Sequence, residues 1–387
     1  MVAETADGLS GLLQLFRDRR ELSRVEVIER SGLSRSTVNH RLAALTESGL
    51  ISALDGGTST GGRPSTRFAF NSARAAVLCV DVGASGFVAA ICDLSGRPLR
   101  QLTTLIDVWE GPERVLKLVA DAFTSLQRNE EVWGVGIGVP GPVEFAAGRV
   151  VNPPIMTGWD GFDISGWIRD RYPGINVVEN DVNARAVAES RLSRQDNLIA
   201  LKLGTGIGAG LVFHGQIIRG SDGAAGDIGH THAGSPSSTP ADVICRCGNT
   251  GCVEAYASGW ALVRDLAAAG MPVDSVSGVV ELVLRGEREA VRLVRNAGRV
   301  VGEAVATMVS VLNPAMIVLS GQLAACDEIL LAGIRERIYQ RALPLATRKL
   351  QIRRSDLGES AGVTGLALIT AGQLLSPAGF EDRMTHV

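Results

Sequence analysis

The stretch LIALKLGTGIGAGLVFHG, residues 198–215, joins two apolar runs through a turn of alternating glycines. Short apolar runs bounded by glycine are typical of buried strands. The turn, residues 204–210, contains a GxGxG pattern, but the Rossmann form of that pattern requires a helix after the glycines, and here LVFHG continues as a strand. We therefore predict a β-hairpin. Its turn either binds a phosphate through exposed N–H groups or has no ligand, and the pattern alone favours neither.

A second unit of the same kind lies earlier in the chain. VLCVDVG, beginning at Val77, is followed directly by FVAAICDLSG, with a turn at residues 81–85. Other apolar runs at 133–141, 175–181 and 316–321 alternate with helical patterns at 113–126 and 287–312. Strands that alternate with helices predict an α/β fold, and two similar hairpin units predict two similar lobes. We assign residues 75–195 to the first lobe and 196–387 to the second, and we expect the C-terminal helix to return to the first lobe.

The first 74 residues predict a separate winged helix-turn-helix domain. Ser23 and Glu26 form a capping box at one helix start, and Gly32 ends that helix. Ser34 caps the next helix, in which Val38, Leu42 and Leu45 recur at the spacing of one buried face. Two strands, at about 50–54 and 66–70, follow and form the wing.

The exposed face of the second helix carries side chains that can donate to phosphates and base edges. The candidate DNA contacts on it are Arg35, Ser36, Thr37, Asn39 and His40. Arg63, in the wing loop, is a candidate for the minor groove. The alternative is a three-helix unit that binds protein. Residues 1–74 hold ten Arg and eight acidic residues, a net charge of +2, against −5 for the rest, which favours DNA.

ENDVNARAVAE, residues 179–189, predicts a strand end followed by a helix with Asn183 as its N-cap. Asp181 would then lie just before the helix, at the carboxyl end of a strand, where it could accept a proton from a substrate hydroxyl. A simple capping role for Asp181 is the alternative, and position alone favours it.

The composition is that of a globular protein, with 45% hydrophobic and 20% charged residues. No apolar run reaches the roughly 18 residues of a membrane span. The start of the chain, MVAETADGLS, lacks the basic-then-apolar pattern of a signal peptide. We therefore expect a cytoplasmic protein with no membrane partner, in which thiols stay reduced and clustered cysteines favour a metal over a disulfide.

CRCGNTGC, residues 245–252, supplies three such thiols: Cys245, Cys247 and Cys252. Structural zinc takes four ligands, and GDIGHTHAG upstream offers His230 and His232. One histidine and three cysteines would give a closed structural Zn²⁺ site, and reduced cysteines without a metal are the alternative. The other three cysteines, in apolar runs, are expected in the core: Cys79, Cys92 and Cys326.

Five elements occur in order, DVGAS, ENDVNA, GTGIGAG, GDIGH and CRCGNTGCVEAYASG. Together they resemble the ROK family of sugar kinases and sugar-responsive repressors. Repressor members carry a leading winged helix with a Gly-Gly-Arg-Pro wing like residues 61–64. The chain therefore looks like a repressor of the xylose or N-acetylglucosamine type.

The resemblance implies a two-lobe actin-like, ribonuclease H-like fold, as in ATPases and sugar kinases, with a sugar cleft between the lobes. It makes His230 both the fourth zinc ligand and a sugar contact. The sugar-binding positions that it implies are Asn152, Asn180, Asp181, Asp227, His230 and Glu254. The phosphate-binding positions are Asp81, Gly83, Ser85, Gly204, Thr205, Gly206 and Gly208. In kinase members Asp181 would be the catalytic base.

The chain departs from the kinase pattern at several of these positions. Asp227 stands where the family usually has Glu, Ser85 where kinases favour Thr, and residues 320–322 contain one glycine where kinases tend to have two. The segment after His230 is also longer than usual, which leaves His232 as a substitute ligand. We therefore predict a sugar-responsive repressor that binds a palindromic operator as a homodimer or homotetramer. The alternative is a sugar kinase, or a bifunctional protein, that uses ATP and Mg²⁺.

Overall fold

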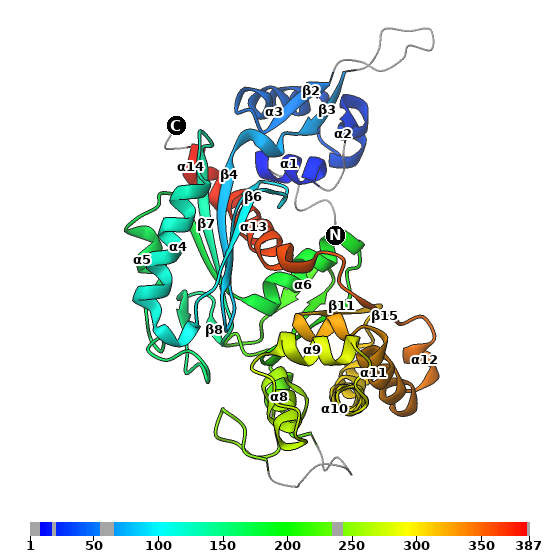
Figure 1. Cartoon of the computed structure of the whole chain (residues 1–387). Coiled ribbons are helices and arrows are strands. Elements are labelled where there is room, and N and C mark those ends of the chain that lie inside the picture. The colour runs from blue at the N-terminus through cyan, green and yellow to red at the C-terminus, as the bar shows by residue number, and fades with distance from the viewer. Residues whose placement is uncertain (1–7, 18–20, 55–65, 234–242, 385–387) are drawn as a thin grey trace.

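The computed structural model describes residues 8–17, 21–54, 66–233 and 243–384. A small N-terminal domain stands on one end of a larger body that is built around two β-sheets (Figure 1). In the part of the chain that is described, no helix has both the length and the apolar character needed to cross a lipid bilayer.

The N-terminal domain is a winged helix-turn-helix. Its elements are α1 (Leu9–Arg17), β1 (Leu22–Ser23), α2 (Arg24–Ser31), α3 (Arg35–Glu47), β2 (Ile51–Leu54) and β3 (Arg67–Phe70). The predicted capping box is present, since Ser23 and Glu26 bond reciprocally at the start of α2. Gly32 ends α2 with φ 67°, and the Ser34 hydroxyl accepts from the Thr37 N–H at 3.2 Å to start α3. Val38, Leu42 and Leu45 are buried, as predicted.

The first lobe contains a five-stranded sheet in the order β10-β7-β4-β5-β6. Its strands are β4 (Ala76–Val82), β5 (Phe87–Asp93), β6 (Pro98–Thr104), β7 (Val132–Val139) and β10 (Ile175–Asn180). β4, β7 and β10 are parallel, whereas β4, β5 and β6 form an antiparallel meander. One face of the sheet packs on α4 (Pro112–Leu126) and α5 (Ile164–Arg169) through alternate residues such as Leu78 and Val80.

The second lobe repeats this topology. Its sheet has the order β13-β12-β11-β14-β15. The strands are β11 (Leu198–Leu203), β12 (Ile207–Phe213), β13 (Gln216–Ile218), β14 (Met316–Ser320) and β15 (Gln351–Arg354). Again three strands are parallel and three form an antiparallel meander, so the predicted hairpin of residues 198–215 is present as β11 and β12. The predicted α/β fold with two similar lobes is confirmed.

Helices cover the outer face of the second sheet and connect its strands. They are α7 (Val253–Ala257), α8 (Gly259–Ala268), α9 (Val276–Leu284), α10 (Arg288–Leu312), α11 (Glu328–Arg341) and α12 (Pro344–Thr347). The longest, α10, buries a stripe that includes Val294, Val301 and Val305 in the core of this lobe. A short ribbon of β8 (Val143–Glu144) and β9 (Arg149–Val150) belongs to the first lobe.

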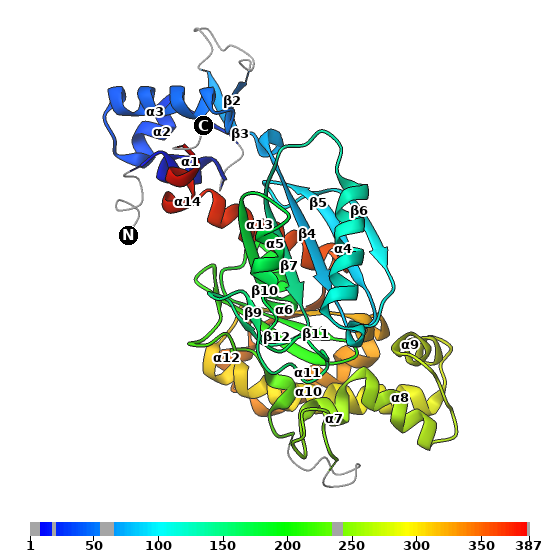
Figure 2. The same cartoon turned by 90° about the vertical axis from the view of Figure 1, so that its left-hand side faces the viewer.

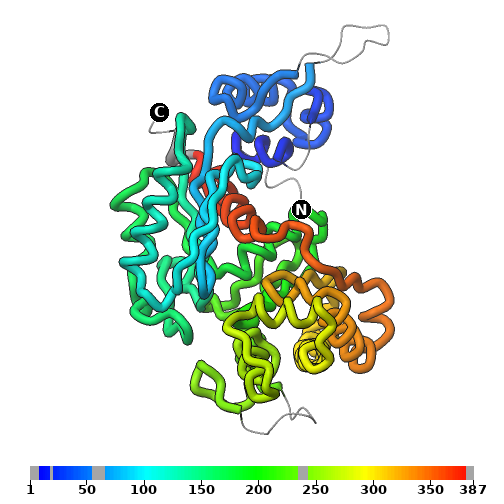
Figure 3. Tube along the Cα trace, viewed as in Figure 1, coloured from blue at the N-terminus to red at the C-terminus, as the bar shows by residue number. Residues whose placement is uncertain are grey.

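Two helices lie between the lobes and link them. α6 (Asp181–Ser193) contacts β11 and β12 of the second sheet, and α13 (Ala361–Leu374) contacts α6 and the inner face of the first sheet. The chain thus crosses back from the second lobe, and the red C-terminal trace in Figure 3 follows this return. α14 (Pro377–Met384) then meets α1 of the N-terminal domain (Figure 2).

One hydrophobic cluster continues from the N-terminal domain into the first lobe. It contains Leu12, Leu13 and Phe16 of α1 together with Leu374 and Leu375 at the end of α13. Cys79 and Cys92, on the inner face of the first sheet, belong to the same cluster, as predicted for core cysteines. The winged helix-turn-helix domain is therefore packed onto the C-terminal helices and not attached by the chain alone.

Candidate functional site

A cavity of about 800 Å³ lies between the two lobes. Its walls come from the turn after β4, the start of α6, the hairpin turn of β11 and β12, and the loops before α7. Each residue that the sequence assigned to sugar or phosphate binding lines this cavity: Asp81, Gly83, Ser85, Asn152, Asn180, Asp181, Gly204, Thr205, Gly206, Gly208, Asp227, His230 and Glu254. The fold brings these separate segments to one cleft.

Glycine-rich turns from both lobes face the cavity. In the first, the Gly83 N–H donates to the Gly86 carbonyl at 2.7 Å, and Ser85 is exposed at the tip. In the second, the Gly204 N–H donates to the Gly206 carbonyl at 3.0 Å. A strand, β12, follows the second turn, which excludes the Rossmann arrangement.

The start of α6 differs from the sequence prediction. Asn180, and not Asn183, is the N-cap, because its Oδ1 accepts from the N–H groups of Val182 at 2.9 Å and Asn183 at 3.2 Å. Asp181 is the first helical residue. The Asn183 amide instead donates to Glu179 at 3.0 Å. The Nδ2 of Asn180 donates to the Gly141 carbonyl at 3.0 Å, which leaves its second N–H for a ligand.

Hydrogen bonds within the protein also fix two other polar residues of the cavity wall, Asn152 and Glu254. Asn152 has a left-handed backbone with φ 42°, and its N–H donates to Asp160 Oδ1 at 2.7 Å. Glu254 is buried and accepts from the Ile207 N–H at 3.0 Å and the Trp260 indole at 3.3 Å. Glu254 therefore fixes the glycine turn of the second lobe in addition to facing the cavity.

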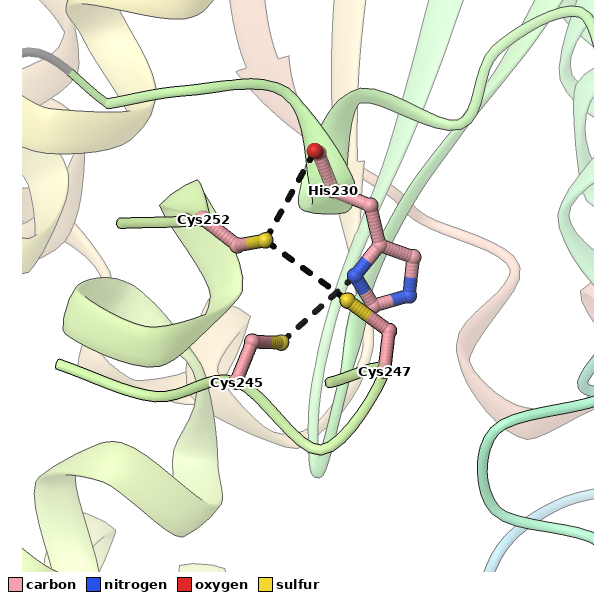
Figure 4. A group of neighbouring side chains, drawn as sticks. All are labelled: His230, Cys245, Cys247 and Cys252. Carbon is pink, nitrogen blue, oxygen red and sulfur yellow. Dashed lines mark hydrogen bonds between the residues drawn. The ribbon is translucent and has the colours of Figure 1, made fainter. Parts of the chain in front are cut away.

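Four side chains converge beside this wall: His230, Cys245, Cys247 and Cys252 (Figure 4). Their ligand atoms all lie within 4.8 Å of one another. Cys245 Sγ is 3.6 Å from His230 Nδ1, and Cys247 Sγ is 3.7 Å from Cys252 Sγ. A tetrahedral zinc with bonds of about 2.3 Å to sulfur and about 2.1 Å to nitrogen separates sulfurs by about 3.8 Å and sulfur from nitrogen by about 3.6 Å. The donor set and its spacing fit such an ion.

Burial also affects the protonation of the thiols. It raises the pKa of the Cys252 thiol to about 12 and likewise raises the pKa of Cys245. The thiols are therefore protonated without a metal, and a zinc ion would displace their protons on binding. The cluster takes its histidine from His230, whereas His232 forms a backbone bridge with Cys252. Since Nδ1 of His230 faces the thiols, Nε2 is the ring nitrogen that remains for a ligand in the cavity.

Two functional candidates were missed by the sequence analysis. Lys202, on β11, pairs with Asp181, and Arg185, on α6, pairs with Asp81. Burial raises the pKa of Asp81, and the Arg185 guanidinium opposes that rise. A signal existed for both residues: Lys202 interrupts an apolar strand just before the glycine turn, and Arg185 lies one helical turn after Asp181.

In the N-terminal domain, α3 presents a polar outer face. Arg35, Ser36, Asn39 and His40 are exposed on it. Thr37 is partly buried, and its hydroxyl contacts that of Ser34 at 2.8 Å. Arg63, the predicted wing contact, lies outside the described residues.

Comparison with known proteins agrees with this architecture. The ROK family matches residues 77–373, and the winged helix-turn-helix DNA-binding family matches residues 11–52. A xylose repressor of Caldicellulosiruptor bescii is 26% identical over 94% of this chain and 95% of its own length. A glucokinase of Thermotoga maritima is 29% identical over 75% of this chain and 95% of its own.

A solved structure extends the likeness to the whole fold. The crystal structure of a ROK family transcriptional regulator, described as a homologue of the E. coli MLC protein, aligns with a TM-score of 0.81. It covers 99% of this chain and 100% of its own at 23% identity. The family match spans most of the chain, and the N-terminal domain precedes it. The chain therefore belongs to the ROK family and carries a winged helix-turn-helix in front of the family's actin-like kinase fold.

Proposed function

We propose that the protein is a transcriptional repressor that binds operator DNA through its winged helix and responds to a sugar in the interlobe cavity. One observation carries the proposal. The winged helix is packed onto the C-terminal helices, and one of these, α13, packs onto α6 and β4, which contribute residues to the cavity wall. A ligand that moves the lobes thus acts on the support of the DNA-binding domain. The 26% identical xylose repressor aligns over 94% of this chain.

DNA recognition would use the outer face of α3. Arg35 and Asn39, exposed near its start, can reach phosphates and base edges in a major groove, and Arg63 of the wing would contact the minor groove. A symmetric dimer, or a tetramer made of such dimers, would align two winged helices on a palindrome.

Sugar recognition would use the carboxylate and amide groups of the cavity. Asp181, Asp227 and Glu254 offer acceptors, and Asn152 and Asn180 offer N–H donors. Zinc, when bound by His230 and the three cysteines, would supply a rigid brace for the loop that carries His230. The ring then keeps a fixed orientation toward a sugar hydroxyl.

The two functions would be coupled through lobe closure. Sugar changes DNA affinity only to the extent that it binds one arrangement of the lobes better than the other. Both glycine turns and Asp181 face one cavity, and this observation favours a second candidate, an ATP- and Mg²⁺-dependent sugar kinase with Asp181 as base.

A DNA selection tests the main proposal. The zinc-loaded full chain is incubated with a library of random duplexes, and bound sequences are amplified and read. We expect a palindromic motif with half-sites about one helical turn apart, or a multiple of that spacing, and affinity that falls steeply with salt. If no motif is recovered, and the Arg35→Ala variant retains as much DNA as the unchanged protein, the proposed operator-binding function is wrong.

A further inference from the structure

Two positively charged side chains form ion pairs with the two carboxylates that lie beside the glycine turns. The Lys202 ammonium, from β11 of the second lobe, is paired with Asp181 at the start of α6. The Arg185 guanidinium, one turn further along α6, is paired with Asp81 near the end of β4. Asp81 and Asp181 are only 4% and 1% exposed. The charges of the four groups sum to zero before any ligand enters the cleft.

We propose that Lys202 and Arg185 take the place that Mg²⁺ would have in a kinase of this fold, so that the cleft binds its sugar without a divalent ion and transfers no phosphoryl group. The inference rests on the proposed function, in which the cavity takes a sugar. It names the two residues that make this cavity a sensor.

Asp81 has no room for a hydrated ion. Mg²⁺ usually keeps several of its waters and binds through one or two carboxylates. One oxygen of Asp81 is taken by Arg185, and the other, Oδ1, is buried without a hydrogen-bond partner among the described residues. Gly362 of α13 packs so closely that a Cβ there would lie 2.0 Å from Asp81 Oδ2. Asp81 borders the cavity, but its carboxylate is held between α6 and α13 and the residue is only 4% exposed.

At Asp181 a neighbouring positive charge, and not lack of space, opposes the binding of a divalent ion. Its Oδ2 accepts from the Lys202 ammonium, so a positive charge already occupies one of its two oxygens, and Oδ1 is the oxygen left for a ligand. A second positive charge, Arg185, stands one turn away. Both cations would repel a divalent ion placed at the two carboxylates with which they pair. A sugar hydroxyl can still donate to Asp181, so recognition does not require phosphoryl transfer.

The proposal is tested by adding Mn²⁺, an EPR-visible substitute for Mg²⁺, with and without ATP. The proteins are the zinc-loaded full chain and its variants Lys202→Met, Arg185→Met and the double variant. Lys202→Arg, which keeps the charge, is the matched control. We expect the double variant to bind one Mn²⁺ per chain at least tenfold more tightly than the unchanged protein, and the control to show no gain. Equal Mn²⁺ affinity in the unchanged protein and a folded double variant would overturn the proposal.

Folding and function are followed separately. Circular dichroism melting and zinc content identify a variant that fails to fold, in which case either single variant, expected to show a smaller gain, replaces the double variant. In the unchanged protein, the shift of melting temperature caused by xylose, glucose or N-acetylglucosamine should be the same with and without Mg²⁺. ADP release by the unchanged protein with any of these sugars would also overturn the inference. Absence of a thermal shift with every sugar would instead count against the proposed sugar-sensing function, and the Mn²⁺ comparison would still decide the role of the cations.

Discussion

The side-chain amide of Gln14, in α1 of the DNA-binding domain, donates a hydrogen bond of 3.1 Å to the carbonyl of Leu375 at the end of α13. The other end of α13 lies at the cavity, where Gly362 packs against Asp81. With 14 residues, this helix spans about 21 Å. It is therefore a continuous packed element between the cleft and the winged helix.

We expect the change Gln14→Ala to weaken the coupling between the two sites. The hydrogen bond is remote from α3, so operator affinity without sugar should change by less than about threefold. The effect of sugar on that affinity, typically about 1–3 kcal/mol for coupled sites, should shrink. Fluorescence anisotropy of labelled operator, with and without sugar, measures both quantities. Glu29→Ala, on the exposed face of α2, is the control, and an equal loss of coupling in it would contradict the role of α13.

Arg35→Ala and Asn39→Ala should weaken operator binding in different ways. An arginine that contacts a phosphate contributes to the affinity for every DNA sequence. Arg35→Ala should therefore lower the salt dependence of DNA binding by roughly one released counterion. An asparagine that contacts a base edge contributes to one sequence position, so Asn39→Ala should cost about 1–3 kcal/mol of binding free energy and relax specificity at that position. Binding isotherms over a range of salt concentrations separate the two. Arg285→Ala, an equal charge change on an exposed second-lobe side chain, should leave both properties unaltered.

Cys247→Ser should release the metal and abolish the sugar response. Three ligands remain, and a structural zinc site needs four. The loop of His230 would then lose its brace, while the winged helix, far along the chain, should still bind operator. Atomic absorption gives the metal content, and Cys326→Ala, a core cysteine outside the cluster, is the control. One zinc per chain in Cys247→Ser would show that the cluster is not the site.

Arg246, between two of the metal ligands, should slow the escape of sugar. Its guanidinium lies 5.7 Å from the Trp109 ring centroid in the first lobe and 4.9 Å from that of Trp260 in the second. A cation–π contact at an exposed site is worth about 0.5–1 kcal/mol, so loss of the contact to Trp109, which joins the two lobes, should speed sugar dissociation roughly two- to fivefold in Arg246→Ala. Stopped-flow tryptophan fluorescence measures this rate. Arg264→Ala removes a contact to Trp260 and hydrogen bonds to Ala255 and Asp265, all within the second lobe, so it should have a smaller effect on the rate.

Local signals in the sequence predicted the elements that local chemistry determines. Ser23, Gly32 and Ser34 set the ends of α2 and α3 because caps act within one turn. The hairpin of β11 and β12 followed from its apolar runs and glycines. Asn183 was the wrong cap because Asn180 lies three residues earlier with the same side chain, and spacing cannot distinguish them.

Local signals in the sequence could not predict which charged side chains pair at the cleft. Lys202 meets Asp181, and Arg185 meets Asp81, only after two lobes and α6 have assembled. The edge strands β6 and β13 were also not predicted. β6 alternates partly buried and exposed residues, a weak pattern, and β13 has only three residues.

The most direct test of the account is operator affinity measured with and without each sugar that raises the melting temperature, in parallel with ADP release under Mg·ATP. The unchanged protein and Asp181→Asn are compared. We predict that one sugar changes operator affinity at least tenfold in the unchanged protein, that Asp181→Asn loses this response while still binding operator, and that neither protein releases ADP. ADP release that depends on Asp181, with operator affinity unaffected by every sugar that binds, would contradict the account.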